Sequence, residues 1–493
     1  MEYILAIDQG TSSTKTILFD QDGKIFAKSS EPLKTTYLPN GFVEQDPEEI
    51  ESNMLASVKK CLDDFKVKGG ELSSIKVCGI SNQRETFLVW DDKGVPICNA
   101  IVWQCKRSID ICERWKKEGR EPLIRSTTGL IIDPYFSGTK LVWLYENDPK
   151  VKTALDAGKA FFGTVDTWLL FKLTKGKSYF TDYTNASRTL FFNLNTLGWD
   201  RGLLKAFGLS NLNLPVPRPS AAFFGSTDFK GLLPFEIEIA AMVGDSHAAA
   251  FGEGCFSPGI AKATMGTGCS VIMNIGDQPR ESKNGMVTTI CWSTADKVQY
   301  AFEGVIVTCG ATIEWLKNEL RLFADSQETE TLATAVPDNG GVYFVPAFSG
   351  LGAPHWEMNR KASVTGLTFG TRKNHIVRAA LESIPYQIKD VIAAMELDTT
   401  IRLQHLMVDG GLSSNNFIIR FLADLLERPV INIGIQEVSA LGAAYLAGLQ
   451  KKIFADFHHI TRLNSERKLT EPTGDERVMA WYKGWKDILK SNK

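Results

Sequence analysis

The sequence lacks the signatures of several common classes of enzyme and binding protein. It has no GxxxxGK[ST] loop and no GxGxxG turn after a strand, which excludes a Walker-type ATPase and a Rossmann dehydrogenase. It has no apolar run of about 18 residues, so no transmembrane helix is expected. The 493 residues carry a net charge of −2 with both signs interspersed, so nothing indicates nucleic-acid binding.

Cysteine is present, but in no paired pattern. The nine cysteines include no CxxC motif, and an odd number of them is typical of reduced thiols in a cytoplasmic protein. Cys98, Cys105 and Cys112 are evenly spaced, but with no nearby histidine or fourth cysteine we expect core packing rather than a metal site. The chain enters a strand at once and leaves no room for a signal peptide, which also predicts a cytoplasmic location.

The first fifteen residues form the most informative segment. An apolar strand from Tyr3 ends in Asp8, a Gly/Thr/Ser turn follows, and a second strand is expected over 16–19. Successive N–H groups and hydroxyls in such a turn can bind phosphate oxygens, and a carboxylate at the strand end can hold the accompanying Mg²⁺. An ordinary hairpin with a polar turn is the alternative. The segment predicts a nucleotide site with Asp8 as a metal ligand and with three phosphate donors: Thr11, Ser12 and Ser13.

The same device recurs past the middle of the chain. A strand over 260–265 leads into Gly266-Thr267-Gly268, and a second strand follows over 270–274. A further glycine turn at Gly410-Gly411 precedes an expected helix over 417–426, whose first N–H groups could meet phosphate or nucleoside. The repetition predicts a duplicated fold that clamps one nucleotide between two halves, with Thr267 as another phosphate donor.

Strands and helices alternate along the chain, the pattern of an α/β fold. Asp46-Pro47-Glu48-Glu49 predicts a helix to about Phe65, with a cap, a proline at the first position and a glutamate reaching back to the cap. Residues 215–219 read as a rigid connection. The apolar residues of the C-terminal segment predict one face of a helix: Val478, Trp481, Trp485, Ile488 and Leu489.

Long sequence strings accompany these turns: Asp8-Gln9-Gly10-Thr11, Asn82-Gln83-Arg84-Glu85-Thr86, residues 99–104, 129–140, 162–168 and 181–188, Gly244-Asp245, Tyr135-x-Ser137-x-x-Lys140-Leu141-x-Trp143, and Gly366-Leu367 followed by His375-Ile376. Together they resemble, nearly end to end, the FGGY carbohydrate kinases, and within them the glycerol kinases. The resemblance implies two actin/hexokinase-type (ribonuclease H-like) α/β domains, residues 1–254 and 255–493, with the active site in the cleft between them. It further implies ATP and Mg²⁺, closure on substrate, and a homodimer or homotetramer.

Asp245 is the candidate general base. It follows the apolar segment 240–244, so it lies at the carboxyl end of an expected strand, where the family has its catalytic aspartate. A base at the attacking hydroxyl contributes about 10²–10⁴ in rate. Asp245 is also expected to help Asp8 hold Mg²⁺. The alternative is an aspartate that caps the helix over 246–251, a role compatible with catalysis.

The resemblance also assigns the two substrate sites. The polyol contacts map onto Arg84, Glu85, Trp103, Tyr135 and Asp245. In physical terms the guanidinium donates, the carboxylate accepts from two neighbouring hydroxyls, and the indole offers a flat face to the carbon chain. The nucleoside contacts map onto Gly310, Gly411 and Asn415. Lys15 stands where glycerol kinases commonly carry arginine, and it offsets γ-phosphate charge without the bidentate fork.

Two positions depart from the glycerol kinase pattern. Ser246 replaces the usual glutamine after the catalytic aspartate, and Ser270 replaces an aromatic residue two positions after Gly268. Both changes remove bulk beside the triol and add a hydroxyl. One lost hydrogen bond is worth about 0.5–1.5 kcal/mol, which weakens glycerol binding without excluding it. Glycerol is the expected substrate, and a larger polyol or sugar is the alternative.

Three other kinds of protein are alternatives to an active kinase. A chaperone with the same hairpins needs a peptide-binding domain, for which no residues remain, and a filament protein is separable by sedimentation with ATP. A silent relative is expected to lose Asp8, Thr11 or Asp245, and all three are present. Residues 226–234 lack the glycine-rich loop ending in arginine with which some relatives bind a sugar bisphosphate, so no such feedback is expected.

Overall fold

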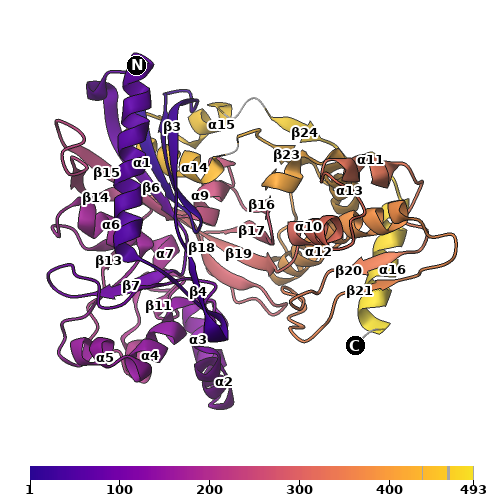
Figure 1. Ribbon diagram of the computed structural model, residues 1–493, viewed down its shortest axis with the longest axis horizontal. Helices are drawn as coiled ribbons and strands as arrows, with labels where there is room; N and C mark the ends of the chain where they lie inside the picture. The colour runs from indigo at the N-terminus through magenta and orange to yellow at the C-terminus, as the bar shows by residue number, and fades with distance from the viewer. Residues whose placement is uncertain (436, 464–466, 492–493) are drawn as a thin grey trace.

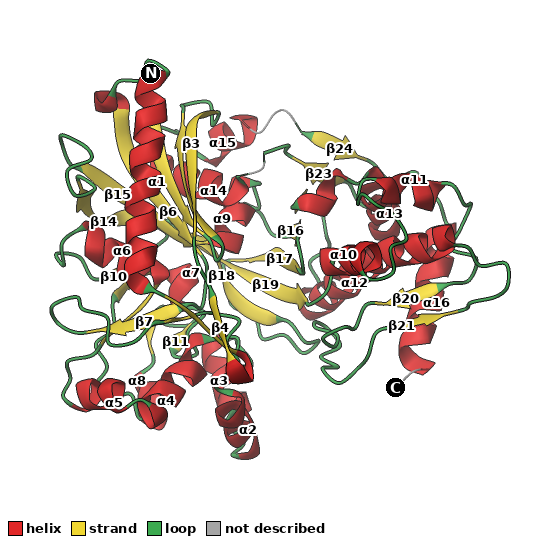
Figure 2. Ribbon diagram, viewed as in Figure 1, coloured by secondary structure: helices red, strands yellow, loops and turns green. Residues whose placement is uncertain are grey.

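The computed structural model describes residues 1–435, 437–463 and 467–491. The chain forms two α/β halves side by side, each built on a central sheet flanked by helices (Figures 1 and 2). No helix in these ranges is both long and apolar enough to cross a membrane. The two halves meet along strands of the second sheet, and this meeting place holds the candidate site.

The N-terminal half contains a six-stranded sheet in the order β14-β15-β6-β1-β2-β3. Its strands are β1 (Tyr3–Gln9), β2 (Ser13–Phe19), β3 (Ile25–Pro32), β6 (Ile75–Asn82), β14 (Ala221–Thr227) and β15 (Ile237–Gly244). β1 and β15 both run parallel to β6, with Gln9 and Gly244 in register with Asn82. Three carboxyl ends therefore meet at one edge of the sheet, and the residues that follow these strands lie close together.

The C-terminal half repeats this arrangement in a seven-stranded sheet of order β18-β19-β17-β16-β22-β23-β24. Its strands are β16 (Ile260–Met265), β17 (Cys269–Gly276), β18 (Val287–Ser293), β19 (Val298–Ile306), β22 (His405–Asp409), β23 (Val430–Asn432) and β24 (Lys468–Thr470). The β16–β17 hairpin runs beside parallel β22 as the β1–β2 hairpin runs beside parallel β6. The predicted duplication of the strand-turn-strand hairpin is confirmed.

Smaller sheets and helices complete both halves. The N-terminal half adds β4 (Thr36–Leu38), β5 (Phe42–Gln45), β7 (Phe87–Trp90), β8 (Ala100–Ile101), β9 (Phe161–Thr164), β10 (Phe180–Asp182), β11 (Phe192–Asn193), β12 (Gly198–Trp199) and β13 (Val216–Arg218). Its helices are α1 (Pro47–Val67), α2 (Ile109–Lys117), α3 (Glu121–Thr128), α4 (Ser137–Asn147), α5 (Pro149–Asp156), α6 (Val165–Leu173), α7 (Tyr183–Ala186), α8 (Arg201–Ala206) and α9 (Asp245–Gly252). The C-terminal half adds β20 (Tyr343–Val345), β21 (Ser363–Thr365), α10 (Gly310–Asn318), α11 (Glu328–Thr334), α12 (Lys373–Thr399), α13 (Asn416–Leu426), α14 (Val438–Gln450), α15 (Phe457–Leu463) and α16 (Arg477–Ser491).

Helix α14 comes late in the sequence but packs against the sheet of the N-terminal half. Figure 1 shows α14 and α15, in yellow, among the indigo and purple elements of the first half. α14 packs on β1, β6 and β15 and against α9, and its residues 440–447 are all buried. The approach is so close that a Cβ on Gly442 would lie 1.8 Å from the carbonyl oxygen of Ala248, and one on Gly79 would lie 2.3 Å from that of Ala443. Glycine at both positions lets the helix seat against its neighbours.

Local predictions had mixed outcomes. The cap of α1 is confirmed, because the Asp46 side chain accepts from the Glu48 N–H. The predicted reach of Glu49 back to the cap is wrong, since its Oε1 accepts from the Lys34 N–H at 3.0 Å. The second strand begins at residue 13 instead of 16 because the turn is tighter than expected, and the connection over 215–219 contains β13, which pairs with β10. The apolar stripe of α16 is confirmed: Val478, Trp485 and Leu489 are buried.

The seating of α14 predicts the effect of adding one methyl group. We expect Gly442→Ala to lower the free energy of unfolding by about 1–3 kcal/mol, because the new Cβ must displace the α9 backbone. Chemical denaturation measures this loss. Gly370→Ala is the matched control, since its Cβ would stand 3.6 Å from Thr368 Oγ1 in an exposed loop. Equal stability of the two variants would contradict the close packing of α14.

Candidate active site

The carboxyl ends of three parallel strands bring Asp8, Arg84 and Asp245 together. Asp8 is near the end of β1, Arg84 follows β6, and Asp245 follows β15. The Arg84 Nε lies 3.2 Å from Asp245 Oδ1. The Asp245 side chain is 37% exposed, whereas that of Arg84 is 4% exposed. A largely buried cation therefore supports a carboxylate that remains open to a substrate.

Asp8 lies in a region of excess negative charge. Its Oδ1 accepts from the Ser81 hydroxyl at 2.9 Å. Burial, assisted by the charges of Asp245 and Glu437, raises the pKa of Asp8 to about 6, against the lowering effects of Ser81 and Lys15. A divalent cation beside Asp8 and Asp245 would relieve this repulsion, so these carboxylates fit Mg²⁺, which takes hard oxygen ligands. The described residues hold no group of three or more metal-ligating side chains.

The turn between β1 and β2 closes on itself and touches the predicted polyol site. The Gly10 N–H donates to the Ser13 carbonyl at 2.9 Å, while Ser12 is exposed. The Thr11 hydroxyl accepts from Trp103 Nε1 at 3.0 Å, which links the phosphate turn to that indole. The Lys15 ammonium lies 2.7 Å from Glu437 Oε2, beside the first residue of α14.

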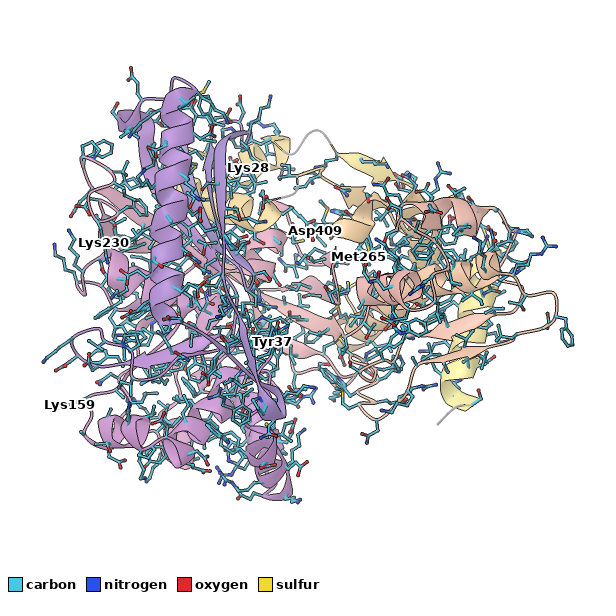
Figure 3. All side chains as sticks on the ribbon, in the orientation of Figure 1. Lys28, Tyr37, Lys159, Lys230, Met265 and Asp409 are labelled. Atoms are coloured by element: carbon cyan, nitrogen blue, oxygen red, sulfur yellow. The ribbon has the colours of Figure 1, made fainter. Side chains whose placement is uncertain are left out.

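The second hairpin turn forms one surface with the start of α10 and the glycine turn after β22. The Gly310 N–H donates to Gly266 O at 2.9 Å and the Ala311 N–H to Thr267 O at 3.1 Å. Met265 and Asp409 lie close together at the inner side of the C-terminal half (Figure 3), where Thr264 pairs with Asp409. A pocket of about 450 Å³ adjoins them, lined by Asp409, Gly410, Gly411, Ser413, Ser414, Asn432, Gly434 and Ile435.

Asn415 is largely occupied by the fold. Its side chain caps α13, with the carbonyl oxygen accepting from the Ile418 N–H at 3.2 Å and the amide donating to Thr329 Oγ1 at 3.2 Å. Gly411 lines the pocket directly, whereas Asn415 is not one of the lining residues and has 9% of its surface exposed. A nucleoside contact of Asn415 stays a prediction.

The remaining residues of the predicted polyol site form a compact aromatic and ionic group. The Trp103 and Tyr135 rings meet edge to face at 5.5 Å between centroids. Glu85 is buried and has a left-handed φ of 59°, a strained conformation of the kind that clusters at functional sites. Its backbone carbonyl accepts from Ser137 Oγ at 2.8 Å, and its Oε1 lies 2.6 Å from Arg188 Nε. The geometry therefore fixes both ends of Glu85.

Two charged residues at this site were not singled out from the sequence. Glu303 lies between Arg84 and Arg188, and Ser270 donates to it at 3.1 Å. The signal for Glu303 was a lone carboxylate in the apolar stretch 300–306, since a buried charge requires a partner. Arg188 lies in the string 181–188, and nothing in that string by itself indicates a role for the arginine.

His247 adds no second base. It is fully buried, and burial, together with the charge of Arg84, holds its pKa well below the ordinary value, so the ring is neutral. Its Nε2 lies 3.5 Å from Thr289 Oγ1. The cysteine prediction also fits, because Cys105 and Cys112 are buried and all nine thiols are free.

Comparison with known proteins decides the family. Models of the FGGY family of carbohydrate kinases match the chain twice, the N-terminal domain model over residues 3–252 and the C-terminal domain model over 261–450. The chain belongs to the FGGY family of carbohydrate kinases. It is therefore an ATP-dependent kinase with an alcohol acceptor, and the predicted actin/hexokinase-type fold is confirmed.

The relatives of this FGGY kinase include several glycerol kinases. It is 47% identical to the glycerol kinase of Carboxydothermus hydrogenoformans over 98% of this chain and 97% of the relative. It is 45% identical to glycerol kinase 2 of Thermotoga maritima over 99% and 98%. Among solved structures, Plasmodium falciparum glycerol kinase with ADP matches with a TM-score of 0.94 at 35% identity, covering 100% of this chain and 98% of that one.

The charge around Asp8 predicts a pH-dependent stability. Because the pKa of Asp8 is raised, the stability contributed by its neutral form is lost as pH rises from about 4 through about 6. We expect Asp8→Asn to stabilise the magnesium-free protein at pH 7.5 by about 1–2 kcal/mol, after allowance for solvent screening, and to lose this advantage near pH 4. Denaturant titration at both pH values tests it. Asp92→Asn, at an exposed turn, is the control and should show no such difference.

Proposed function

We propose that this FGGY kinase transfers the γ-phosphate of ATP to glycerol and releases sn-glycerol 3-phosphate and ADP. The observation that carries the proposal is the exposed Asp245 carboxylate beside the buried Arg84, at the strand edge it shares with the β1–β2 phosphate hairpin. The glycerol kinases related to this chain over nearly their full lengths support the choice of acceptor.

In this mechanism each side chain has a defined task. Asp245 accepts the proton of the attacking hydroxyl, whose oxygen forms a bond to the γ-phosphorus as the bond to the ADP oxygen breaks. Arg84 donates to the polyol, Glu85 accepts from two neighbouring hydroxyls, and Trp103 and Tyr135 line the carbon chain. The phosphates are held by Thr11, Ser12, Ser13, Lys15 and Thr267, and the nucleoside by Gly310, Gly411 and Asn415.

Magnesium belongs to the same proposal. Asp8 and Asp245 would hold the ion, and the raised pKa of Asp8 supports a cation at this place. When bound, Mg²⁺ neutralises the charge that develops on the transferred phosphoryl group. Lys15, the cross-strand partner of Asp8 in the β1–β2 hairpin, complements the ion as a point charge.

A larger polyol or sugar is the second candidate. The small side chains of Ser246 and Ser270 favour it, because they leave space where glycerol kinases usually have larger ones. The Ser270 hydroxyl also donates to Glu303 at 3.1 Å, so it is used within the protein and not for a substrate.

The division into residues 1–254 and 255–493 is supported by the ranges of the two family models. The cytoplasmic location, the homodimer or homotetramer and the lack of bisphosphate feedback stay predictions.

The acceptor is testable directly. We expect coupled ADP release with Mg-ATP to be fastest with glycerol in a panel that also contains dihydroxyacetone, tetritols, pentitols and inositols. Comparison of kcat/KM across the panel measures the preference. A much higher value for a larger polyol would replace glycerol and leave the family assignment intact.

The base is testable by one substitution. We expect Asp245→Asn to lower kcat by about 10²–10⁴, because the amide cannot accept the proton of the attacking hydroxyl. ATP binding, measured by calorimetry, should be unchanged within about twofold. Near-normal turnover by this variant would remove Asp245 from the role of base.

A further inference from the structure

Glu303 is a buried carboxylate contributed by the half of the molecule opposite to the polyol residues. It lies in β19 and is the only charged residue of that strand. Its side chain has no exposed surface. A single buried carboxylate is costly unless it is paired and hydrogen-bonded, so its partners define its role.

Those partners come chiefly from the N-terminal half. Arg84 reaches Glu303 with both terminal nitrogens, at 3.1 Å to Oε2 and 2.8 Å to Oε1. The Arg188 Nη1 lies 2.7 Å from Oε2, and Ser270 Oγ donates to Oε1 at 3.1 Å. Oε1 of Glu303 thus accepts from Arg84 and Ser270, whereas Oε2 accepts from Arg84 and forms an ion pair with Arg188. The fork of Arg84 is held in the bidentate geometry that fixes a guanidinium plane.

The contacts continue as an alternating chain of charges. It runs from Asp245 to Arg84 at 3.2 Å, from Arg84 to Glu303, from Glu303 to Arg188, and from Arg188 to Glu85 at 2.6 Å. Both ends of the chain are residues of the proposed polyol site, and its centre is Glu303. Burial opposes ionisation of Glu303, but Arg188 and Arg84 outweigh it and hold the pKa of that carboxyl well below its usual range.

We propose that Glu303 is a positioning residue of the polyol site. It holds Arg84 so that the guanidinium presents its donors to the substrate, and it holds Arg188, which in turn orients the Glu85 carboxylate toward the substrate. The inference rests on the proposed function, which places the polyol at Arg84 and Glu85. Glu303 itself touches neither substrate in this scheme, and it acts through the two guanidinium groups.

Glu303→Gln tests the proposal because it keeps the shape and removes the charge. We expect KM for the polyol to rise at least about tenfold, the equivalent of one weakened charge-assisted hydrogen bond, with KM for ATP within about twofold of wild type. Glu303→Asp keeps the charge on a shorter stem and should restore part of the polyol affinity. Polyol binding by calorimetry without nucleotide gives the same comparison on folded protein.

Glu382→Gln is the matched control. Glu382 is equally buried and pairs with Arg378 at 2.8 Å, but it lies in α12 and takes no part in the charge chain of Glu303. Its other partners are Asn339 and Tyr386. We expect this variant to lose thermal stability and to keep both KM values. If Glu303→Gln behaved in the same way, the positioning role would be overturned, because a structural carboxylate changes the amount of active enzyme and not its polyol affinity.

An Arg84→Lys variant separates this inference from the function on which it rests. A rise in polyol KM in Arg84→Lys but not in Glu303→Gln would overturn only the role of Glu303. Unchanged polyol affinity in both variants would remove the polyol site itself from Arg84, and the inference with it. If Glu303→Gln does not fold, Ser270→Ala, which removes one donor to the same oxygen, is expected to raise polyol KM by about two- to fivefold, and no rise would overturn the proposal.

Discussion

Pairing of buried charges is the constraint on which the site depends. Two guanidinium groups and two carboxylates are almost fully withdrawn from water at the junction of the halves, and Asp245 lies at the open end of the series. In such surroundings an unpaired charge is far more costly than at a surface. The order in which positive and negative groups alternate is therefore fixed, and with it the orientation of the Arg84 and Glu85 side chains.

The second constraint is the register of the parallel strands. Because β1, β6 and β15 end at one edge, residues separated by some 240 positions of chain become neighbours without long loops. The C-terminal sheet repeats the arrangement with β16 and β22, and the glycine turn at its edge opens onto the pocket. The same topological device thus underlies both the proposed acceptor site and the proposed nucleotide site.

The sequence indicated the strands, the duplicated turns and the family because these depend on local patterns. Asp8, Asp245 and the two hairpins could be placed at strand ends from apolar runs and glycines alone. The role of Glu303 could not be predicted from the sequence, because it depends on ion pairs with Arg84 and Arg188, which are distant along the chain. Asn415 shows a related limit: its position was identified, but its commitment to the cap of α13 and to Thr329 is visible only in three dimensions. The predicted hydrogen bond of the Glu49 carboxylate to the cap of α1 was wrong because this carboxylate accepts from the Lys34 N–H instead.

The return of α14 to the first sheet also bears on how the protein is made. The helix that covers β1, β6 and β15 is encoded some two hundred residues after the last of these strands. At typical elongation rates of about 5–20 residues per second, the ribosome needs roughly 10–40 seconds to span that distance. During this interval the face of the sheet that α14 buries in the folded protein lacks that helix as its cover.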